Sequence, residues 1–315
     1  MSTCLKFVNV HKTYRVHRGI LGVYATVPAV AGVDLTVAHG ETVGLVGESG
    51  CGKSTLAKLA VRLETPTAGQ VFLEGLDLWK DQTLPERLPE VAQMIFQDPF
   101  SSLDPRMTIE QSVGEGLLAR NIGDAGSRRA RVLELLDMVG LSASHAGRYP
   151  HQFSGGQRQR AAIARALTLS PRLIVCDEPV SALDVSIQAQ VLNILEDLKT
   201  QLGLTYLFIS HDLAVVSHLS DRVAVMYAGQ LMELAPAVTL YAVPKHPYTR
   251  MLLAAIPTPG PTRYAAPRQE RQGPDQARKN VCPFLPRCPE ADAICAEAPP
   301  WRELSPGHFA RCHHS

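Results

Sequence analysis

Residues 47–54, Gly-Glu-Ser-Gly-Cys-Gly-Lys-Ser, form the stretch whose spacing points most directly to chemistry, because they fit the phosphate-loop pattern G-x-x-x-x-G-K-[ST]. The glycines allow the backbone to curl until successive N–H groups face phosphate oxygens, and a following helix adds the positive end of its dipole. In such a loop Lys53 reaches the β- and γ-phosphates, and the Ser54 hydroxyl ligates Mg²⁺. A glycine-rich turn that fits by chance is the alternative. The predicted loop residues are Gly47, Glu48, Ser49, Gly50, Cys51, Gly52, Lys53, Ser54 and Thr55.

Two carboxylates follow an apolar run elsewhere in the chain. Residues 173–176 are continuously apolar, as buried parallel strands are, and Asp177 and Glu178 come directly after them. Asp177 would hold Mg²⁺, directly or through water, and Glu178 would polarise the attacking water. An ordinary acidic turn after a strand is the alternative.

A serine and two glycines stand before a third segment of interest. Ser154-Gly155-Gly156-Gln157 precedes a helix-compatible run at residues 158–169. Glycines at a helix start can present backbone N–H groups to an anion. Such a turn would be unremarkable alone, but it lies a short distance upstream of the acidic strand.

Strands alternate with helices around these motifs. Strands are predicted at residues 42–46, 173–176, 206–209 and 223–226, and a helix is predicted at 185–202. This alternation predicts an α/β architecture with a parallel sheet.

The segments outside this alternation differ in character. Residues 7–10 and 30–37 predict strands, with a loop expected at 15–28 between them. Residues 128–139 place apolar side chains at helical spacing and are followed by Gly140, which predicts an amphipathic helix. After about residue 244 the composition changes, so we expect a linker and a small appended module.

Composition narrows the class of protein. The chain has 315 residues, 45% of them hydrophobic, and a net charge of +1, so no basic excess argues for nucleic acid as a partner. No signal-peptide pattern and no apolar run of membrane-spanning length is visible, so a soluble, cytosolic protein is expected. Seven cysteines in such a chain do not predict a disulfide framework.

The motifs and their order resemble the ATP-binding cassette (ABC) ATPases over residues 5 to about 245. The resemblance rests on the phosphate loop, on Phe153-Ser154-Gly155-Gly156-Gln157 and on the acidic strand, and equally on residues 96–99, 181–184 and 209–212. It implies an α/β fold with a RecA-like P-loop NTPase core, an N-terminal antiparallel β subdomain and a helical insertion at about residues 98–160. The cassette would occupy residues 1–245.

The resemblance also implies roles for single residues. Gln97 would contact the metal and the attacking water, Glu178 would be the catalytic base, and His211 would steady the γ-phosphate. Mg²⁺ would be held by Ser54, Gln97 and Asp177. Tyr14 matches the aromatic residue that stacks on adenine, although a structural tyrosine near a strand end is the alternative.

Such cassettes work as head-to-tail pairs. Each ATP lies between the phosphate loop of one cassette and the signature motif of the other, so Ser154, Gly155, Gly156 and Gln157 would act on the partner's ATP. This arrangement implies a second ATPase subunit and poor ATP hydrolysis by this chain alone.

Residues 245–253, Lys-His-Pro-Tyr-Thr-Arg-Met-Leu-Leu, resemble the segment after the cassette in di- and oligopeptide import ATPases. This resemblance assigns residues 246–315 to a C-terminal extension. It implies a second, different cassette, two transmembrane permease subunits and an extracytoplasmic substrate-binding protein, with this chain peripheral on the cytoplasmic face of the inner membrane. Glutathione or nickel import is an alternative, as are a non-transport ABC ATPase and a regulatory nucleotide-binding subunit.

Four cysteines in the extension suggest a metal site. Cys282, Cys288, Cys295 and Cys312 are spaced C-x5-C-x6-C-x16-C. Four thiolates hold either Zn²⁺ or an iron–sulfur cluster, and this spacing lacks the paired C-x2-C of many zinc sites. The pattern resembles the C-terminal segment of dipeptide-import ATPases, where a [4Fe–4S] cluster is bound. Zn²⁺ and free thiols are the alternatives.

Overall fold

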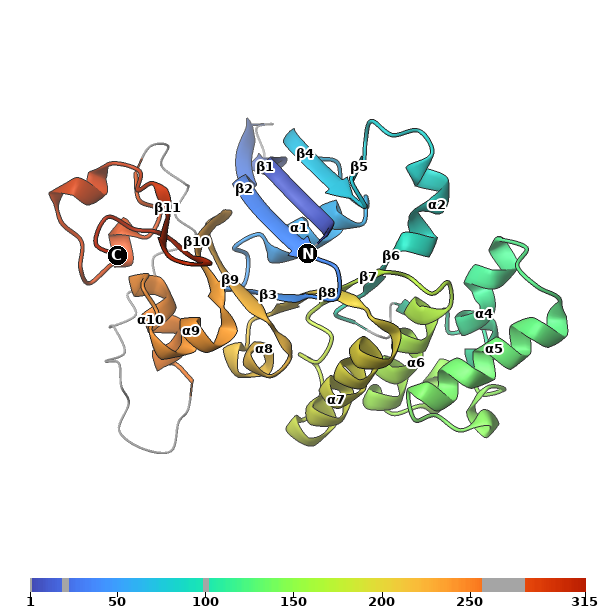
Figure 1. Ribbon diagram of the computed structural model, residues 1–315. Coiled ribbons are helices and arrows are strands. Elements are labelled where there is room, and N and C mark those ends of the chain that lie inside the picture. Colours follow the sequence, from blue (N-terminus) through green and yellow to red (C-terminus); the bar gives the residue numbers. More distant parts are fainter. Residues whose placement is uncertain (1, 19–22, 99–101, 257–280) are drawn as a thin grey trace. The chain divides into compact units, whose positions relative to one another are not determined.

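The computed structural model of the protein describes residues 2–18, 23–98, 102–256 and 281–315 (Figure 1). Contacts divide the chain into two compact units. The first unit comprises Met1–Cys4, Ala38–Glu41 and Asp81–Leu207, and the second comprises Leu5–Val37, Thr42–Lys80 and Phe208–Ser315. Among the described residues, no helix is both long and apolar enough to cross a membrane.

The second unit contains a four-stranded sheet in the order β2-β1-β4-β5. Its strands are β1 (Thr3–Arg18), β2 (Val23–Ala38), β4 (Ala68–Leu73) and β5 (Leu76–Asp77). β4 pairs antiparallel with both β1 and β5. This sheet is the predicted antiparallel β subdomain.

The loop prediction for residues 15–28 is wrong where the structure describes them. β1 continues to Arg18 and β2 begins at Val23, so of residues 15–28 only 19–22 lie outside the described chain. Residues 15–17 and 26–28 are exposed. A strand without a buried face shows no apolar alternation, which explains why these residues resembled a loop.

A second sheet in this unit carries the phosphate loop. β3 (Thr42–Val46) pairs parallel with β9 (Arg222–Tyr227), and β9 pairs antiparallel with β10 (Gln230–Pro236). β3 is buried along its whole length, as the apolar run that follows Thr42 predicts. The described helices of the second unit are α1 (Lys53–Ala60), α8 (Leu213–Leu219), α9 (Ala237–Ala242) and α10 (Pro247–Ala254).

The C-terminal extension continues this same sheet. β11 (Trp301–Ser305) and β12 (His308–Arg311) form an antiparallel pair, and β12 pairs antiparallel with β10. Two short 3-10 helices precede the pair, at Leu285–Arg287 (η3) and Ala293–Ala296 (η4). The predicted linker lies largely in residues 257–280, outside the described residues.

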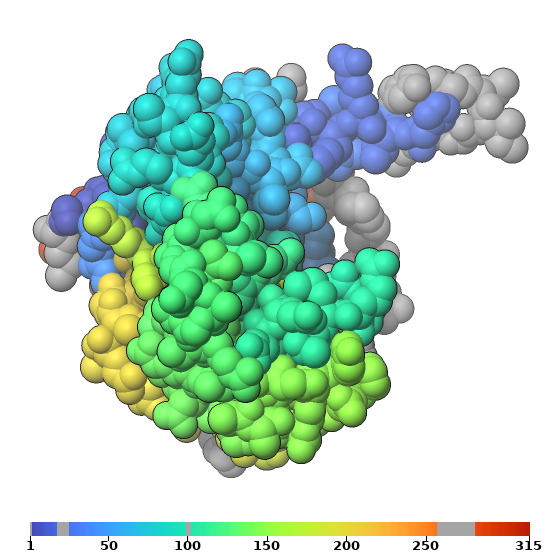
Figure 2. Space-filling view, turned by 90° about the vertical axis from the view of Figure 1, so that its right-hand side faces the viewer, coloured from blue at the N-terminus to red at the C-terminus, as the bar shows by residue number. Residues whose placement is uncertain are grey.

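The first unit contains the helical insertion. The described helices of the first unit are α2 (Leu84–Val91), α4 (Ile109–Ala119), α5 (Ala125–Met138), α6 (Gly155–Leu167) and α7 (Val185–Leu202), with 3-10 turns η1 (Ala143–His145) and η2 (Pro150–Gln152). α4, α5 and α6 pack against one another. Figure 2 shows the surface of this insertion in green.

Helix α5 confirms the predicted amphipathic helix. Its apolar residues Val132, Leu135 and Leu136, and Val139 directly after it, are all fully or almost fully buried. Gly140 ends the helix with φ of +71°, a conformation that glycine adopts at little cost.

Two strands of the first unit place the acidic motif. β6 (Ala92–Ile95) pairs parallel with β7 (Leu173–Asp177), and every residue of β7 is buried. β8 (Thr205–Ser210) carries the chain from the first unit into the second and is also buried throughout.

Candidate functional site

The phosphate loop connects β3 to α1, as predicted, and two of its glycines are required by close packing. A Cβ atom on Gly47 would lie 2.1 Å from the carbonyl oxygen of Met226, and one on Gly52 would lie 2.1 Å from that of Ala29. Both glycines have positive φ, +153° and +111°. The loop therefore depends on glycine for its packing against β9 and β2 as well as for its curvature.

Lys53 lies along the inside of the loop. Its ammonium group donates to the carbonyl oxygens of Gly47 (2.7 Å) and Glu48 (2.9 Å). The side chain is buried, so its positive charge is concentrated where phosphate oxygens would bind.

Cys51 is the neighbour of Lys53 within the loop. Burial raises the pKa of the Cys51 thiol, and the charge of Lys53 only partly opposes this effect. Cys51 is therefore a buried, protonated thiol at neutral pH.

Glu48 is held by two residues of the C-terminal extension, which the sequence motifs did not reveal. The hydroxyl oxygen of Tyr248 accepts a hydrogen bond from the Glu48 backbone N–H (2.9 Å). The guanidinium group of Arg287 donates to both carboxylate oxygens of Glu48, at 2.7 and 2.8 Å. In the sequence, only the position of Tyr248 in the His-Pro-Tyr segment hinted that this residue has a particular role.

Tyr14 and His211 belong to the same unit as the loop. Tyr14 lies on β1, with the Lys12 ammonium 5.0 Å from its ring centroid, and Lys12 also pairs with Glu64 (2.7 Å). His211 is exposed directly after β8, where the predicted order places it.

In the first unit, β7 positions both acidic residues. Asp177 is buried at the end of the strand, and Glu178 follows with a left-handed φ of +49°. Residues other than glycine rarely adopt this conformation, and such strain is concentrated at functional sites. Ser181 stabilises the turn by donating from its hydroxyl group to the Glu178 carbonyl oxygen (3.1 Å).

Gln97 and Glu178 lie side by side, a contact that the sequence analysis did not predict. The Gln97 side-chain amide donates to the Glu178 carboxylate across 3.2 Å. Gln97 follows β6, the strand that pairs with β7, so the two side chains come from the ends of adjacent strands.

The signature motif forms the N-terminus of α6. Ser154 and Gln157 form a capping box: the Ser154 hydroxyl oxygen accepts from the Gln157 N–H (3.3 Å), and the Gln157 side chain accepts from the Ser154 N–H (3.0 Å). A Cβ atom on Gly156 would lie 2.4 Å from Cγ2 of Ile187 on α7. Gly156 is thus required for packing between these helices.

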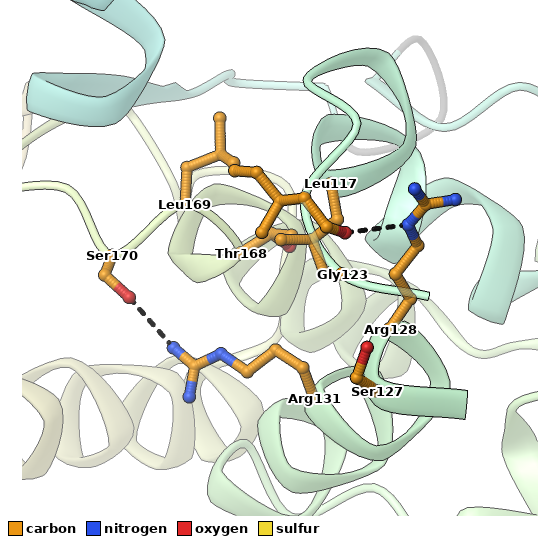
Figure 3. Close-up of a pocket in the computed structure, with 9 residues that line it drawn as sticks. Leu117, Gly123, Ser127, Arg128, Arg131, Thr168, Leu169 and Ser170 are labelled. Carbon is orange, nitrogen blue, oxygen red and sulfur yellow. Dashed lines mark hydrogen bonds between the residues drawn. The ribbon is translucent and has the colours of Figure 1, made fainter. Parts of the chain in front are cut away.

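A separate cavity of about 330 Å³ lies within the helical insertion (Figure 3). Arg131 donates to the Ser170 hydroxyl group (3.1 Å), and Arg128 donates to the Ile122 carbonyl oxygen (2.8 Å). The cavity contains none of the predicted site residues.

The four predicted metal-binding cysteines all lie in the C-terminal extension. Cys282, Cys295 and Cys312 are buried, and Cys288 is half-buried. Burial, together with nearby Cys282 and Cys312, raises the pKa of Cys288 to about 11. Burial also raises the pKa values of Cys282 and Cys312.

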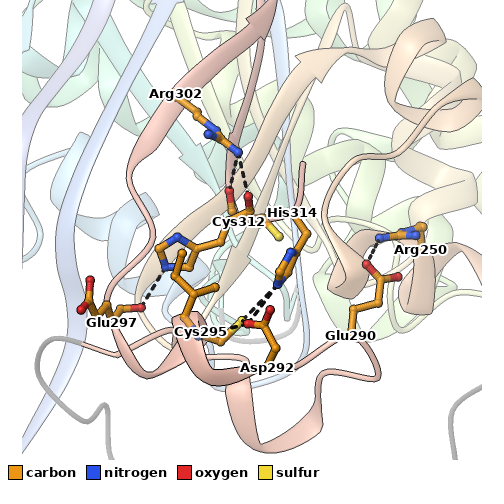
Figure 4. A network of polar contacts seen from close by, with 10 residues as sticks. Arg250, Glu290, Asp292, Cys295, Glu297, Arg302, Cys312 and His314 are labelled. Carbon is orange, nitrogen blue, oxygen red and sulfur yellow. Dashed lines mark hydrogen bonds and ion pairs between the residues drawn. The ribbon is translucent and has the colours of Figure 1, made fainter.

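Cys295 has a second set of neighbours (Figure 4). His314 Nε2 lies 3.6 Å from the Cys295 sulfur and 3.3 Å from the Asp292 carboxylate. The ligand atoms of Asp292, Cys295 and His314 all lie within 4.8 Å of one another, whereas the cysteine sulfurs of the described extension do not form such a group.

Two protein families match this chain. The ABC transporter family matches residues 30–181, and the family described as the C-terminal region of oligopeptide/dipeptide transporters matches residues 232–295. The oligopeptide transport ATP-binding protein AppF of Bacillus subtilis is 47% identical over 99% of this chain and 97% of its own length. A putative peptide import ATP-binding protein of Brucella ovis is 51% identical, covering 91% of this chain and 92% of its own.

Solved structures agree in fold. A dimeric ATP-binding cassette in a post-hydrolysis state, bound to ADP and Pi, has a TM-score of 0.66 and 31% identity over 74% of this chain and 98% of its own. A cassette from Clostridium perfringens that is part of an ABC transporter complex has a TM-score of 0.66 and 25% identity, covering 77% and 92% of the two chains. The chain therefore belongs to the ABC transporter family as an ATP-binding cassette, with the C-terminal region of the oligopeptide/dipeptide transporter branch.

Proposed function

We propose that this cassette hydrolyses ATP to energise the import of di- or oligopeptides through a membrane ABC transporter. The observation that carries the proposal is the presence in one chain of the cassette, matched at residues 30–181, and the transporter C-terminal region, matched at 232–295. The relatives at 47% and 51% identity are named as oligopeptide transport and putative peptide import ATP-binding proteins, which supports the same cargo class.

We assign the residue roles by the family resemblance and by local geometry. Lys53 and Ser54 bind the phosphates and Mg²⁺, and Asp177 acts on the metal. Glu178 polarises the attacking water, and Gln97 orients it, which is consistent with their hydrogen bond of 3.2 Å. His211 contacts the γ-phosphate, and Tyr14 stacks on adenine.

The signature residues serve the partner's nucleotide in this proposal. The N-terminus of α6 at Gly155 offers backbone N–H groups and a positive dipole end to an anion. A second cassette, two transmembrane permease subunits and an extracytoplasmic binding protein complete the transporter. The chain would then be peripheral, on the cytoplasmic face of the inner membrane.

Reconstitution of the complete transporter in vesicles tests the cargo. We expect di- or oligopeptides delivered by the binding protein to stimulate ATP turnover. Stimulation by glutathione or a nickel chelate, with none by peptides, would assign the cassette to those cargoes instead. Failure of the chain to copurify with any membrane subunit would favour a non-transport ATPase.

We further propose that Cys282, Cys288, Cys295 and Cys312 bind a [4Fe–4S] cluster. The donor set fits, because four thiols lie in one module and three of them are buried. Four sulfurs around one Zn²⁺ would be about 3.8 Å apart, from a Zn–S distance of ~2.3 Å. No three cysteine sulfurs of the described extension lie within 4.8 Å of one another, so they are not arranged for a single Zn²⁺. A bound cluster would deprotonate the thiols and cross-link the module.

A single Zn²⁺ on Asp292, Cys295 and His314 is the second candidate, favoured by their close ligand atoms. Cys295 belongs to both sets, so the variants Cys288→Ser and His314→Ala distinguish them. If the cluster is bound, anaerobically purified protein should contain iron and sulfide and absorb broadly in the visible range. Cys288→Ser should remove this absorption, and His314→Ala should keep it. Zinc that is retained in Cys288→Ser and lost in His314→Ala would overturn the cluster.

A further inference from the structure

We propose that Arg287 and Tyr248 are positioning residues for the phosphate loop, so that the C-terminal extension sets the affinity of the cassette for ATP. Both residues contact Glu48, the second residue of the loop. Arg287 contacts the side chain of Glu48 and Tyr248 contacts its backbone. This inference rests on the proposed binding of the ATP phosphates by the loop.

The Arg287–Glu48 contact has the geometry of a specific ion pair. Two parallel hydrogen bonds of 2.7 and 2.8 Å join the guanidinium group to the carboxylate, and this bidentate arrangement fixes orientation as well as charge. The exposed side-chain fractions are 25% for Arg287 and 38% for Glu48, so water screens the pair only in part.

Aromatic residues hold the guanidinium group in place. It lies 5.7 Å from the ring centroid of Tyr227 and 5.9 Å from that of Phe284. Tyr227 ends β9 and Phe284 lies in the extension, and their rings meet edge to face at 5.4 Å. Cation–π contacts of this kind restrict the rotamers of an arginine, so Arg287 is preorganised towards Glu48.

Tyr248 is anchored by its own helix. It is completely buried, and its ring packs against Tyr227 and Phe284 at centroid distances of 4.7 and 5.3 Å. His246 caps α10 by accepting from the Tyr248 N–H at 3.0 Å. The Tyr248 hydroxyl group is therefore a fixed acceptor for the Glu48 N–H.

A buried carboxylate ties this helix to the last strand. Glu233 on β10 accepts from the backbone N–H groups of Lys245 (2.7 Å) and His246 (2.9 Å). It also bonds to His308 of β12 at 2.7 Å, with both side chains buried. The extension therefore reaches the loop through a continuous set of packed and hydrogen-bonded groups.

The charge of Glu48 explains why the contact matters for ATP. A carboxylate within the phosphate loop repels a triphosphate, and Arg287 neutralises that carboxylate. Without Arg287 the loop would keep one uncompensated negative charge beside the nucleotide. Without the Tyr248 hydroxyl group, the Glu48 N–H would lose its acceptor and the loop backbone would be less restrained.

Equilibrium binding of Mg-ATP to the full-length chain tests the charge argument. We expect Arg287→Gln to raise the Kd about three- to tenfold at low ionic strength, and less at high salt. The double variant Glu48→Gln/Arg287→Gln should return towards the wild-type Kd, because it removes both charges. Arg250→Gln is the matched control, since it removes the 2.8 Å Arg250–Glu290 pair of the same extension and should leave the Kd unchanged.

Tyr248→Phe tests the backbone contact while it keeps the buried ring. We expect a raised Kd for Mg-ATP, and a raised KM with a nearly unchanged kcat in the assembled transporter. Tyr241→Phe is its control, because that hydroxyl group donates to the Leu213 carbonyl oxygen instead. The proposal would be overturned if Arg287→Gln and Tyr248→Phe both bound Mg-ATP with wild-type affinity. It would also be overturned if Glu48→Gln/Arg287→Gln bound Mg-ATP no more tightly than Arg287→Gln. Wild-type affinity in Lys53→Ala would instead overturn the proposed function of the loop.

Discussion

Gln97 donates a hydrogen bond from its side-chain amide to the carboxylate of Glu178, across 3.2 Å. The two residues are 81 positions apart in the chain, and they meet because β6 and β7 are parallel neighbours. The contact places an amide beside the proposed catalytic base, where it can orient that base and the water it polarises.

Gln97→Ala should therefore slow ATP hydrolysis without preventing ATP binding. We expect the kcat of the assembled transporter to fall about tenfold or more, because positioning of a general base contributes on this scale. Steady-state ATP turnover measures the change, and Mg-ATP binding to the same variant is the control. A kcat equal to that of the wild-type protein would show that the contact has no catalytic role.

Lys53→Ala should lose nucleotide affinity. The substitution removes a buried ammonium group that faces the inside of the loop. We expect Mg-ATP binding to weaken by about a hundredfold, as charge-assisted contacts to phosphate are worth about 1.5–3 kcal/mol each. Lys58→Ala is a matched control, because Lys58 is an exposed lysine on the same helix. Equal affinities of the two variants would contradict the role of Lys53.

Gly156→Ala should destabilise the packing of α6 on α7. The added Cβ atom would lie 2.4 Å from Cγ2 of Ile187, and overpacking of this kind costs about 1–3 kcal/mol. Gly147→Ala is the control, since no atom lies within 4 Å of its added Cβ. Thermal unfolding of the two variants, and of Gly156→Ala/Ile187→Ala, checks the argument. The second substitution should recover part of the loss, and no recovery would count against the steric cause.

Stability should fall on mild acidification because of His246. Burial lowers the pKa of His246 to about 4, although Glu233 opposes this change. The unfolded chain, with a histidine pKa of about 6.5, then binds more protons than the folded protein between these two values. Stability is therefore complete above about pH 6.5 and is lost progressively as the pH falls towards about 4, by at most ~3 kcal/mol.

Thermal midpoints of the wild-type protein and of His246→Asn at several pH values measure this effect. Asparagine keeps an acceptor at the start of α10 and cannot titrate. The variant should lose less stability than the wild-type protein between neutral pH and about pH 4.5. Parallel pH profiles would show that His246 does not cause the loss.

Local sequence patterns predicted the central strands and helices closely. β3 and α7 have the predicted bounds, because a continuous apolar run identifies a buried strand and helical spacing identifies a long amphipathic helix. These patterns did not predict the C-terminal end of β1 or the N-terminal end of β2. Exposed residues such as Arg15 and His17 give no periodic pattern of apolar side chains.

The contacts of Glu48 were beyond sequence reasoning for a different reason. Tyr248 lies 200 residues from Glu48 in the chain, and Arg287 lies 239 residues away. Neither residue belongs to a phosphate-loop pattern, so only the pairing of β12 with β10 and the packing of α10 place them beside the loop. The motifs predict residue roles towards ATP, but they contain no information on these contacts of Glu48.

ATP turnover of the complete transporter carrying Glu178→Gln tests the central claim most directly. With peptide-loaded binding protein present, the wild-type complex should hydrolyse ATP. The variant should bind Mg-ATP, keep its two cassettes associated and show little turnover, because an amide cannot polarise the attacking water as a carboxylate does. Hydrolysis at the wild-type rate by the Glu178→Gln complex would contradict the account.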